Sequence, residues 1–241
     1  MTEALPQMQA GSTWIEMSTN DFAEVELLAR RAAELGVDTL ACPVTGGVHR
    51  AEAGDITVLV GGAQQVYERH APALSSMGGR VIYLGGIEQA GVTKVVTNML
   101  AFIHLIAAGE ALMLCAKGGV DLRAAFDAIA ASSGNSFVHE TESQVILNGS
   151  RDINFTMDLV AKDIGLFDDL ARDAGVALEM SPLIVRLFDE ARATYGDREF
   201  SPNIIRRYEE PLGLKVLGSG FPDQMVDDEP EEPGYEVVPR R

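Results

Sequence analysis

GVTKVVTNMLAFIHLIAAGEALMLCAK, residues 91–117, is the stretch that separates two parts of the chain with different patterns. Before it, short apolar runs alternate with helical patterns, whereas from residue 94 to residue 208 apolar side chains recur only at helical spacing. Its most apolar part, residues 99–116, is interrupted by His104, Gly109 and Glu110, and 18 residues are marginal for a bilayer. We therefore expect a buried helix rather than a membrane span.

The part that precedes this stretch predicts alternating strands and helices. Residues 22–36 have apolar side chains at a 3.6-residue period, follow the capping side chains of residues 18–21 and end at Gly36. The other expected elements are a helix at 64–76 and strands at 13–17, 37–41, 56–60 and 81–84. This order is typical of an α/β domain.

The part that follows predicts a domain made only of helices. The expected helices lie at residues 94–117, 121–131, 136–147, 156–174 and 182–195. We divide the chain into an α/β domain at 1–88, an all-helical domain at 89–215 and a tail at 216–241. Because the tail is acidic and rich in Gly and Pro, we expect it to be disordered.

The composition restricts the partners and the compartment. Of the 241 residues, 36 are acidic and 19 are basic, so the formal net charge is −17. The resulting field repels phosphate backbones and anionic headgroups, so neither nucleic acid nor a membrane is expected as a partner. Two cysteines are too few for a disulfide framework, and residues 1–12 do not resemble a secretory signal, which favours the cytoplasm.

Several local signatures do not occur in the sequence. It lacks the dinucleotide-binding G-x-G-x-x-G, the phosphate-binding G-x-x-x-x-G-K-[ST] and the hydrolase G-x-S-x-G. The four histidines have no neighbour at the spacing of metal ligands, so no metal site is expected.

The turn Thr45-Gly46-Gly47 directly follows a predicted strand. It offers a hydroxyl group and unobstructed backbone N–H groups, which is the chemistry needed to hold a carboxylate. The alternative is a tight turn whose glycines serve only a positive φ, and the turn taken alone favours that interpretation.

Lys94 and Asn98 lie four residues apart and so share one face of an otherwise apolar helix. A lysine in this place either extends to water or is kept for proton transfer, since partial burial favours the neutral amine. The carboxamide one turn along favours proton transfer, because it is a poor core residue but orients a hydroxyl or an amine well.

With these segments the chain resembles the β-hydroxyacid dehydrogenase family, which includes 3-hydroxyisobutyrate dehydrogenase and tartronate semialdehyde reductase. The matching motifs, in order, are Met17-Ser18-Thr19, Pro43-Val44-Thr45-Gly46-Gly47 with Ala51-Glu52-Ala53-Gly54, Val60-Gly61-Gly62, Gly91 with Lys94 and Asn98, Ser132-Ser133-Gly134, and Lys162-Asp163 with Gly165-Leu166. Each motif is weak alone, and the six in this order are specific over residues 11–208. The resemblance implies a partial Rossmann-like domain followed by an all-α domain like that of 6-phosphogluconate dehydrogenase.

The resemblance also implies roles for individual residues. Lys94 would be the general acid/base that exchanges a proton with the substrate oxygen, and Asn98 would position that oxygen. Thr19 would lie beside the cofactor, NAD or NADP, and Lys162 would close over it from the helical domain. The substrate would be a hydroxy acid or its semialdehyde.

The carboxylate of that substrate would bind to Thr45, Gly46 and Gly47. The family usually has Ser where this chain has Thr45, and a second Asn where it has Thr97; Thr45 keeps the hydroxyl and adds a methyl group. The family also has a Rossmann half with G-x-G-x-x-G ahead of the strand at 13–17, and this half is missing here.

Two functions follow from the sequence. The first is an NAD(P)-dependent oxidoreductase of the 3-hydroxyisobutyrate dehydrogenase type. The alternative is a catalytically impaired, truncated paralogue that acts as a dimerisation or regulatory module. The apolar helix at 94–117 suggests cover from other helices or from another subunit, and the expected assembly is a homodimer or homotetramer.

Overall fold

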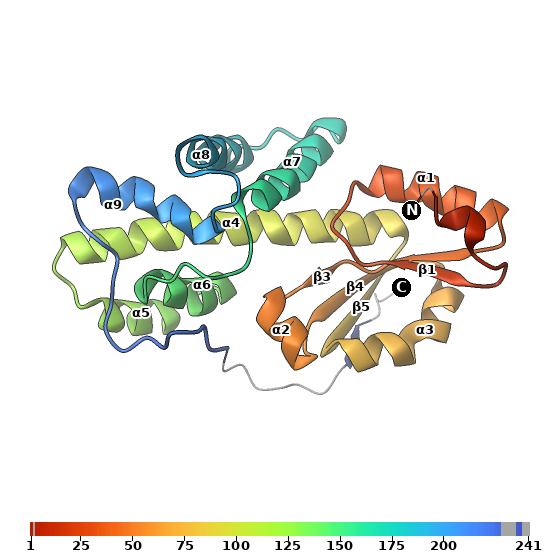
Figure 1. The fold of residues 1–241 in the computed structure, drawn as a ribbon, viewed down its shortest axis with the longest axis horizontal. Coiled ribbons are helices and arrows are strands. Elements are labelled where there is room, and N and C mark those ends of the chain that lie inside the picture. The colour runs from red at the N-terminus through yellow and green to blue at the C-terminus, as the bar shows by residue number, and fades with distance from the viewer. Residues whose placement is uncertain (2, 228–234, 238–241) are drawn as a thin grey trace. The chain divides into compact units, whose positions relative to one another are not determined.

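The computed structural model of the chain describes residue 1, residues 3–227 and residues 235–237 (Figure 1). Its contacts divide into two units, one formed by Met1–Thr97 with Pro230–Arg241 and the other by Asn98–Glu229. The first unit contains the sheet, and the described part of the second contains helices and loops. The predicted order, an α/β part followed by a helical part, is therefore confirmed.

The sheet of the first unit is mixed. Its strands are β1 (Thr13–Glu16), β2 (Asp38–Ala41), β3 (Val44–Thr45), β4 (Thr57–Gly62), β5 (Arg80–Gly85) and β6 (Tyr235–Val237). The order is β1-β2-β4-β5-β6, with β3 paired to β4. The pairs β1–β2, β4–β5 and β5–β6 are parallel, and β4 is antiparallel to β2 and β3. The four predicted strands are present, each within two residues of its expected ends.

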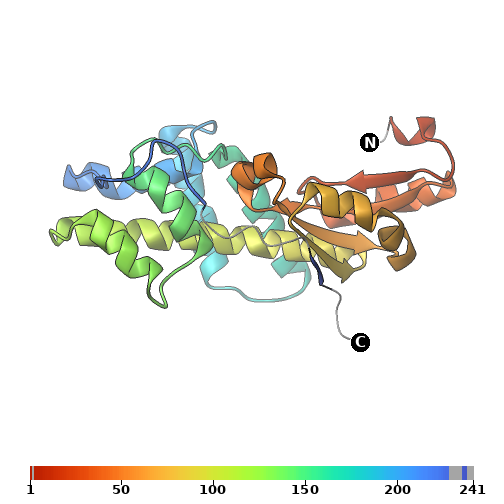
Figure 2. The same ribbon diagram turned by 90° about the horizontal axis from the view of Figure 1, so that it is seen from below.

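Two helices cover opposite faces of this sheet (Figures 1 and 2). Helix α1 (Phe22–Glu34) packs with Trp14 and Ala41, and α3 (Gln64–Met77) packs with Ile15 and Leu40. Consecutive strand residues thus enter different cores, because successive side chains of a strand point to opposite faces. The short helix α2 (Gly47–Ala53), which the sequence did not predict, follows β3.

Helix α4 (Ile87–Lys117) carries the chain from the first unit into the second. It begins seven residues before the expected start at residue 94. By length and composition it could cross a membrane, with a mean hydropathy of 2.0 over its most apolar 18 residues, of which 39% are buried. In the second unit some of its side chains, including Phe102, Leu105 and Leu112, form part of the core, so the helix is buried on one side only.

The second unit packs further helices around α4. They are α5 (Leu122–Ala130), α6 (Phe137–Leu147), α7 (Met157–Asp173), α8 (Met180–Tyr195), a 3₁₀ helix (Ser201–Ile205) and α9 (Arg206–Leu212). The side chains of Asp121 and Ser136 accept hydrogen bonds from backbone N–H groups of the first turn and fix the starts of α5 and α6. At the centre, the rings of Phe102 and Phe188 meet edge to face at 5.5 Å.

Part of the segment predicted to be a disordered tail has a defined place in this unit. Val216 is fully buried, and the Gly218 N–H donates to the carbonyl oxygen of Leu147. The ring of Phe221 meets that of Phe126 edge to face at 5.2 Å. Residues 235–237 of the predicted tail form β6 in the first unit, so the prediction of a disordered tail is wrong for these segments; residues 228–234 and 238–241 lie outside the described residues.

Candidate active site

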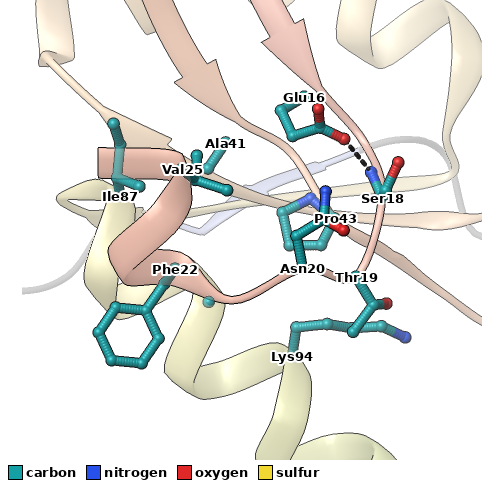
Figure 3. A pocket seen from close by; sticks show the side chains of 11 residues that line it. Glu16, Ser18, Thr19, Asn20, Phe22, Val25, Ala41, Pro43, Ile87 and Lys94 are labelled. Atoms are coloured by element: carbon teal, nitrogen blue, oxygen red, sulfur yellow. Dashed lines mark hydrogen bonds between the residues drawn. The ribbon is translucent and has the colours of Figure 1, made fainter. Parts of the chain in front are cut away.

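A pocket in the first unit lies at the carboxyl ends of β1 and β2 (Figure 3). It is partly open to solvent. Its lining comes from the ends of the two strands and the loop after β1, from α1 and from the start of α4, and consists of Glu16, Ser18, Thr19, Asn20, Phe22, Val25, Ala41, Pro43, Ile87, Gly91 and Lys94.

The topology explains why a pocket forms at this edge. Because β1 and β2 are parallel, their carboxyl ends meet at one edge of the sheet, and the loop that follows each strand starts there. In α/β sheets, ligands bind outside the carboxyl ends of the strands. The loop after β1 leads into α1, whose start is fixed by the side chain of Asp21, which accepts a hydrogen bond from the Ala23 N–H at 2.8 Å.

Glu16 shapes the loop that carries Thr19. Its Oε1 accepts a hydrogen bond from the backbone N–H of Ser18 at 2.8 Å, shown as the dashed line in Figure 3. This contact holds the loop at its first turn, so that Ser18, Thr19 and Asn20 contribute to one wall of the pocket.

Lys94 is the cation of the pocket lining and is 8% exposed. It lies in the second turn of α4, and Figure 3 shows its side chain extending from that helix toward the loop of Thr19. Gly91, one turn earlier, lets α4 lie close to the start of α1, since a Cβ atom there would lie 2.6 Å from Cβ of Phe22. Thr19 and Lys94, which the resemblance assigned to the cofactor and to proton transfer, thus line the same pocket, and these two roles stay predictions.

A second group of polar side chains lies in the helical unit. Asp163 on α7 is 2% exposed, and its Oδ2 accepts a hydrogen bond from Nδ2 of Asn98 at 2.5 Å. Its Oδ1 lies 3.1 Å from Nζ of Lys162, whose side chain is half exposed. Asn98 is one helical turn beyond Lys94 on α4, so the predicted shared face of these two residues is present.

The turn Thr45-Gly46-Gly47 joins β3 to α2 and does not line the pocket. Gly46 and Gly47 have φ values of +127° and +86°, which side chains of L-residues rarely adopt. Both glycines therefore adopt a positive φ, which is what the alternative interpretation, a tight turn, requires. Carboxylate binding at this turn stays a prediction.

One residue of the pocket region is excluded from nucleophilic chemistry. Cys42 lies between the lining residues Ala41 and Pro43, and burial raises the pKa of its thiol to about 12. A thiol with this pKa stays protonated at neutral pH and is a poor nucleophile.

From the sequence, no role is assigned to Glu16 or to Asp163. Glu16 is the last residue of a strand, and its hydrogen bond from the backbone N–H of Ser18 cannot be predicted from the spacing of apolar residues. Asp163 stood in the matching motif Lys162-Asp163 without an assigned role. An acidic residue at an apolar position of α7, between the buried Val160 and Ile164, is the signal that could have identified it.

The chemistry of the pocket lining suits one end of a dinucleotide. The lining combines apolar side chains of Phe22, Val25 and Ile87 with polar groups of the 18–20 loop and the amine of Lys94, a combination that suits a flat ring with a polar substituent such as nicotinamide. A pyrophosphate cradle of the G-x-G-x-x-G type does not occur in the sequence. The residues present therefore fit the nicotinamide end of NAD or NADP.

Two family models together match most of the chain. Residues 1–85 match the NAD binding domain of 6-phosphogluconate dehydrogenase, and residues 89–208 match the model described as NAD-binding of NADP-dependent 3-hydroxyisobutyrate dehydrogenase. Both models describe NAD-binding domains.

Individual relatives agree with these models. The chain is 32% identical to 2-(hydroxymethyl)glutarate dehydrogenase of Eubacterium barkeri, over 89% of this chain and 71% of that protein. It is similar to the crystal structure of 3-hydroxyisobutyrate dehydrogenase from Salmonella typhimurium, with a TM-score of 0.77 and 27% identity, covering 84% of this chain and 72% of that one. A structure of Psf3 in complex with NADP⁺ and 2-OPP has a TM-score of 0.78 and 25% identity, covering 84% and 71%.

The chain spans only part of these proteins, 61–71% of the length of the curated relatives. The matched part holds the Rossmann-like strands and the helical domain in the same order as in this chain. By these matches and by its fold, the chain belongs to the β-hydroxyacid dehydrogenase family.

Proposed function

We propose that this chain is an NAD(P)-dependent oxidoreductase that interconverts a 3-hydroxy acid and its semialdehyde, with Lys94 as the general acid/base. One observation carries the proposal: a buried lysine lines a pocket at the strand ends where this fold binds ligands. NAD or NADP, when bound, accepts or supplies the hydride.

Lys94 carries out the proton transfer of this reaction. In the oxidative direction its Nζ takes the proton of the substrate hydroxyl, and in the reductive direction it returns a proton to the carbonyl oxygen. Burial in the pocket keeps the amine away from bulk water, so that the proton passes between enzyme and substrate. Thr19 and the 18–20 loop form the wall beside it and orient the cofactor ring.

Asn98 and Lys162 serve binding. The carboxamide of Asn98 orients the reacting oxygen, and the half-exposed ammonium of Lys162 attracts the negative charge of the cofactor. The carboxylate of the substrate binds to the turn Thr45-Gly46-Gly47. Hydroxy acids are the substrate class in the names of the relatives, 2-(hydroxymethyl)glutarate and 3-hydroxyisobutyrate, which supports this choice.

The first experiment measures the cofactor and then the turnover. We expect calorimetric titration of the chain with NADH and NADPH to give a dissociation constant below about 1 mM for one of them, the weak end of specific binding. A set of 3-hydroxy acids is then assayed by nicotinamide absorbance. We expect Lys94→Ala to lower kcat by about 10²–10⁴-fold, because general acid/base catalysis contributes this much.

Lys117→Ala is the matched control, since Lys117 is an exposed lysine at the other end of the same helix. It should keep the turnover of the unchanged chain. A Lys94→Ala variant with full turnover would remove Lys94 from the mechanism. Failure of both cofactors to bind would remove the enzymatic function of the chain.

A second candidate is the truncated paralogue that acts as a dimerisation or regulatory module. It is favoured by two exposed leucines of α4, Leu100 and Leu114, which are 48% and 74% exposed on an otherwise apolar helix. We propose that this face pairs in a homodimer or homotetramer in the cytoplasm. A stable dimer in sedimentation, combined with no cofactor binding, would favour this candidate over the enzyme.

A further inference from the structure

Asp163 is a buried carboxylate that the proposed reaction does not use. It is 2% exposed on α7 and contacts two residues that the proposed function does use. Its Oδ2 accepts from Nδ2 of Asn98 at 2.5 Å, and its Oδ1 lies 3.1 Å from Nζ of Lys162. One acidic side chain thus links the amide assigned to the substrate with the ammonium assigned to the cofactor.

The carboxylate of Asp163 determines the orientation of the side-chain amide of Asn98. A carboxylate accepts hydrogen bonds and does not donate them, whereas a carboxamide has a donor side and an acceptor side. The amino group of Asn98 therefore faces Asp163, and its carbonyl oxygen Oδ1 faces another direction. A neutral partner that both donates and accepts would permit either orientation of the amide.

We propose that Asp163 is a positioning residue, which accepts one Nδ2–H of Asn98 and so holds the amide with its second Nδ2–H presented to the reacting oxygen of the substrate, and which holds the ammonium of Lys162 at the same time. This inference rests on the proposed function. It assigns to the buried carboxylate the orientation of a group that contacts the substrate, rather than contact with the substrate itself.

A merely structural role is the competing explanation, because a hydrogen bond between α4 and α7 also joins two helices. The structural role and the positioning role predict changes in different measured quantities. A structural bond affects the thermal midpoint of the second unit. A positioning bond affects kcat and the side-chain amide signal of Asn98 in a protein that is still folded.

The experiment uses Asp163→Ala and Asp163→Asn in the full chain. We expect Asp163→Ala to lower kcat by about 10²-fold, the cost of misplacing a reacting group by about 1 Å, with a smaller change in KM. Asp163→Asn keeps the shape and allows both orientations of the amide, so we expect a smaller loss of kcat and a structure that stays folded.

The second measurement does not need activity. In a ¹H–¹⁵N spectrum of the chain with labelled asparagine, one side-chain proton of Asn98 should be shifted downfield and should exchange slowly, because it is bonded to the carboxylate. Both properties should be lost in Asp163→Ala. Asp169→Ala is the matched control, since Asp169 is on the same helix and pairs with the exposed Arg172.

The outcomes separate this inference from the proposed function. An active chain whose Asp163→Ala and Asp163→Asn variants keep kcat within a factor of about two would overturn the positioning role and leave the proposed function intact. An Asn98 amide signal that does not respond to either variant would also overturn it. An unchanged chain with no cofactor binding and no turnover would overturn the proposed function, and the positioning role with it.

Discussion

Glu142 on α6 has a carboxyl oxygen, Oε2, that is shielded from solvent and has no hydrogen-bond partner within the described part of the chain. Burial raises the pKa of this group from 4.5 to about 8. The carboxyl is therefore protonated at neutral pH in the folded protein and ionised in the unfolded chain. Between these two values the folded state holds a proton that the unfolded state releases.

The expected consequence is a pH dependence of stability. The contribution of protonated Glu142 is fully present below about pH 4.5 and is lost as the pH rises through about 8, at a rate of at most about 1.4 kcal/mol per pH unit. Glu142→Gln removes the titration, so its free energy of unfolding should fall less between pH 5 and pH 9. Guanidinium unfolding at a series of pH values measures this.

Glu179→Gln is the matched control, because Glu179 is an exposed residue of the same unit. Its unfolding profile should follow that of the unchanged chain. The same pH dependence in Glu142→Gln and in the unchanged chain would show that Glu142 does not titrate in this window.

Single residues also show how far the sequence predicts the site. Thr19 and Lys94, which the sequence singled out by resemblance, both line the pocket, and the strand end and the long helix that carry them have clear patterns. Glu16 and Asp163 were not assigned roles, because their partners, the Ser18 N–H and the Asn98 amide, are set by the fold rather than by sequence spacing.

Among the secondary-structure elements, the sequence predicts best those helices that begin after a capping side chain. Asp21, Asp121 and Ser136 each precede an apolar helical pattern, and each side chain accepts a backbone N–H of the first turn. The residue before α4 is Gly86, which has no side chain that could cap a helix, and this helix, expected at residue 94, begins at Ile87. The two-residue strand β3 is too short to have a period.

The segment after α9 shows what composition does not predict. On α6, Gln144 donates from Nε2 to the carbonyl oxygen of Val226 at 2.6 Å and accepts from its N–H at 3.1 Å. One turn along, Asn148 donates to the carbonyl oxygen of Pro222 at 2.8 Å. Two carboxamides thus bind the main chain of a segment that its Gly, Pro and acidic residues marked as disordered.

Phe221→Ala tests how firmly this segment is held. Its ring contacts Phe126 and lies under the guanidinium of Arg123 at 5.2 Å. An aromatic pair contributes about 0.5–1.5 kcal/mol beyond its buried area, so we expect hydrogen exchange of residues 218–227 to become about tenfold faster. Peptide-resolved exchange by mass spectrometry measures this.

Leu114→Ala is the reference variant for this measurement. Leu114 is a 74% exposed residue on α4, and its removal should leave the exchange of residues 218–227 unchanged. If Phe221→Ala exchanged no faster than Leu114→Ala, the aromatic contact would not hold the segment.

At the scale of the whole molecule, the net charge of −17 opposes the proposed ligands. A hydroxy acid and a dinucleotide are both anions, so the field of the protein slows their approach. Raising the salt concentration from 10 to 100 mM shortens the screening length from about 30 Å to about 10 Å. We therefore expect the association rate of the cofactor to rise several-fold, and at most roughly tenfold, in stopped-flow fluorescence.

Nicotinamide, which carries no charge, is the control ligand, and its association should not depend on salt. An association rate of NADH or NADPH that falls with salt would mean that local positive charge, such as that of Lys94 and Lys162, outweighs the global field.

The pairing of β6 with β5 sets the order in which the first unit is completed during synthesis. Tyr235 leaves the ribosome about 150 residues after Gly85, and all of the second unit is translated in between. At about 5–20 residues per second, one edge of β5 waits roughly 8–30 s for its last strand. The nascent sheet thus passes through a long interval as an incomplete sheet, in which a chaperone or a neighbouring nascent chain has access to that edge.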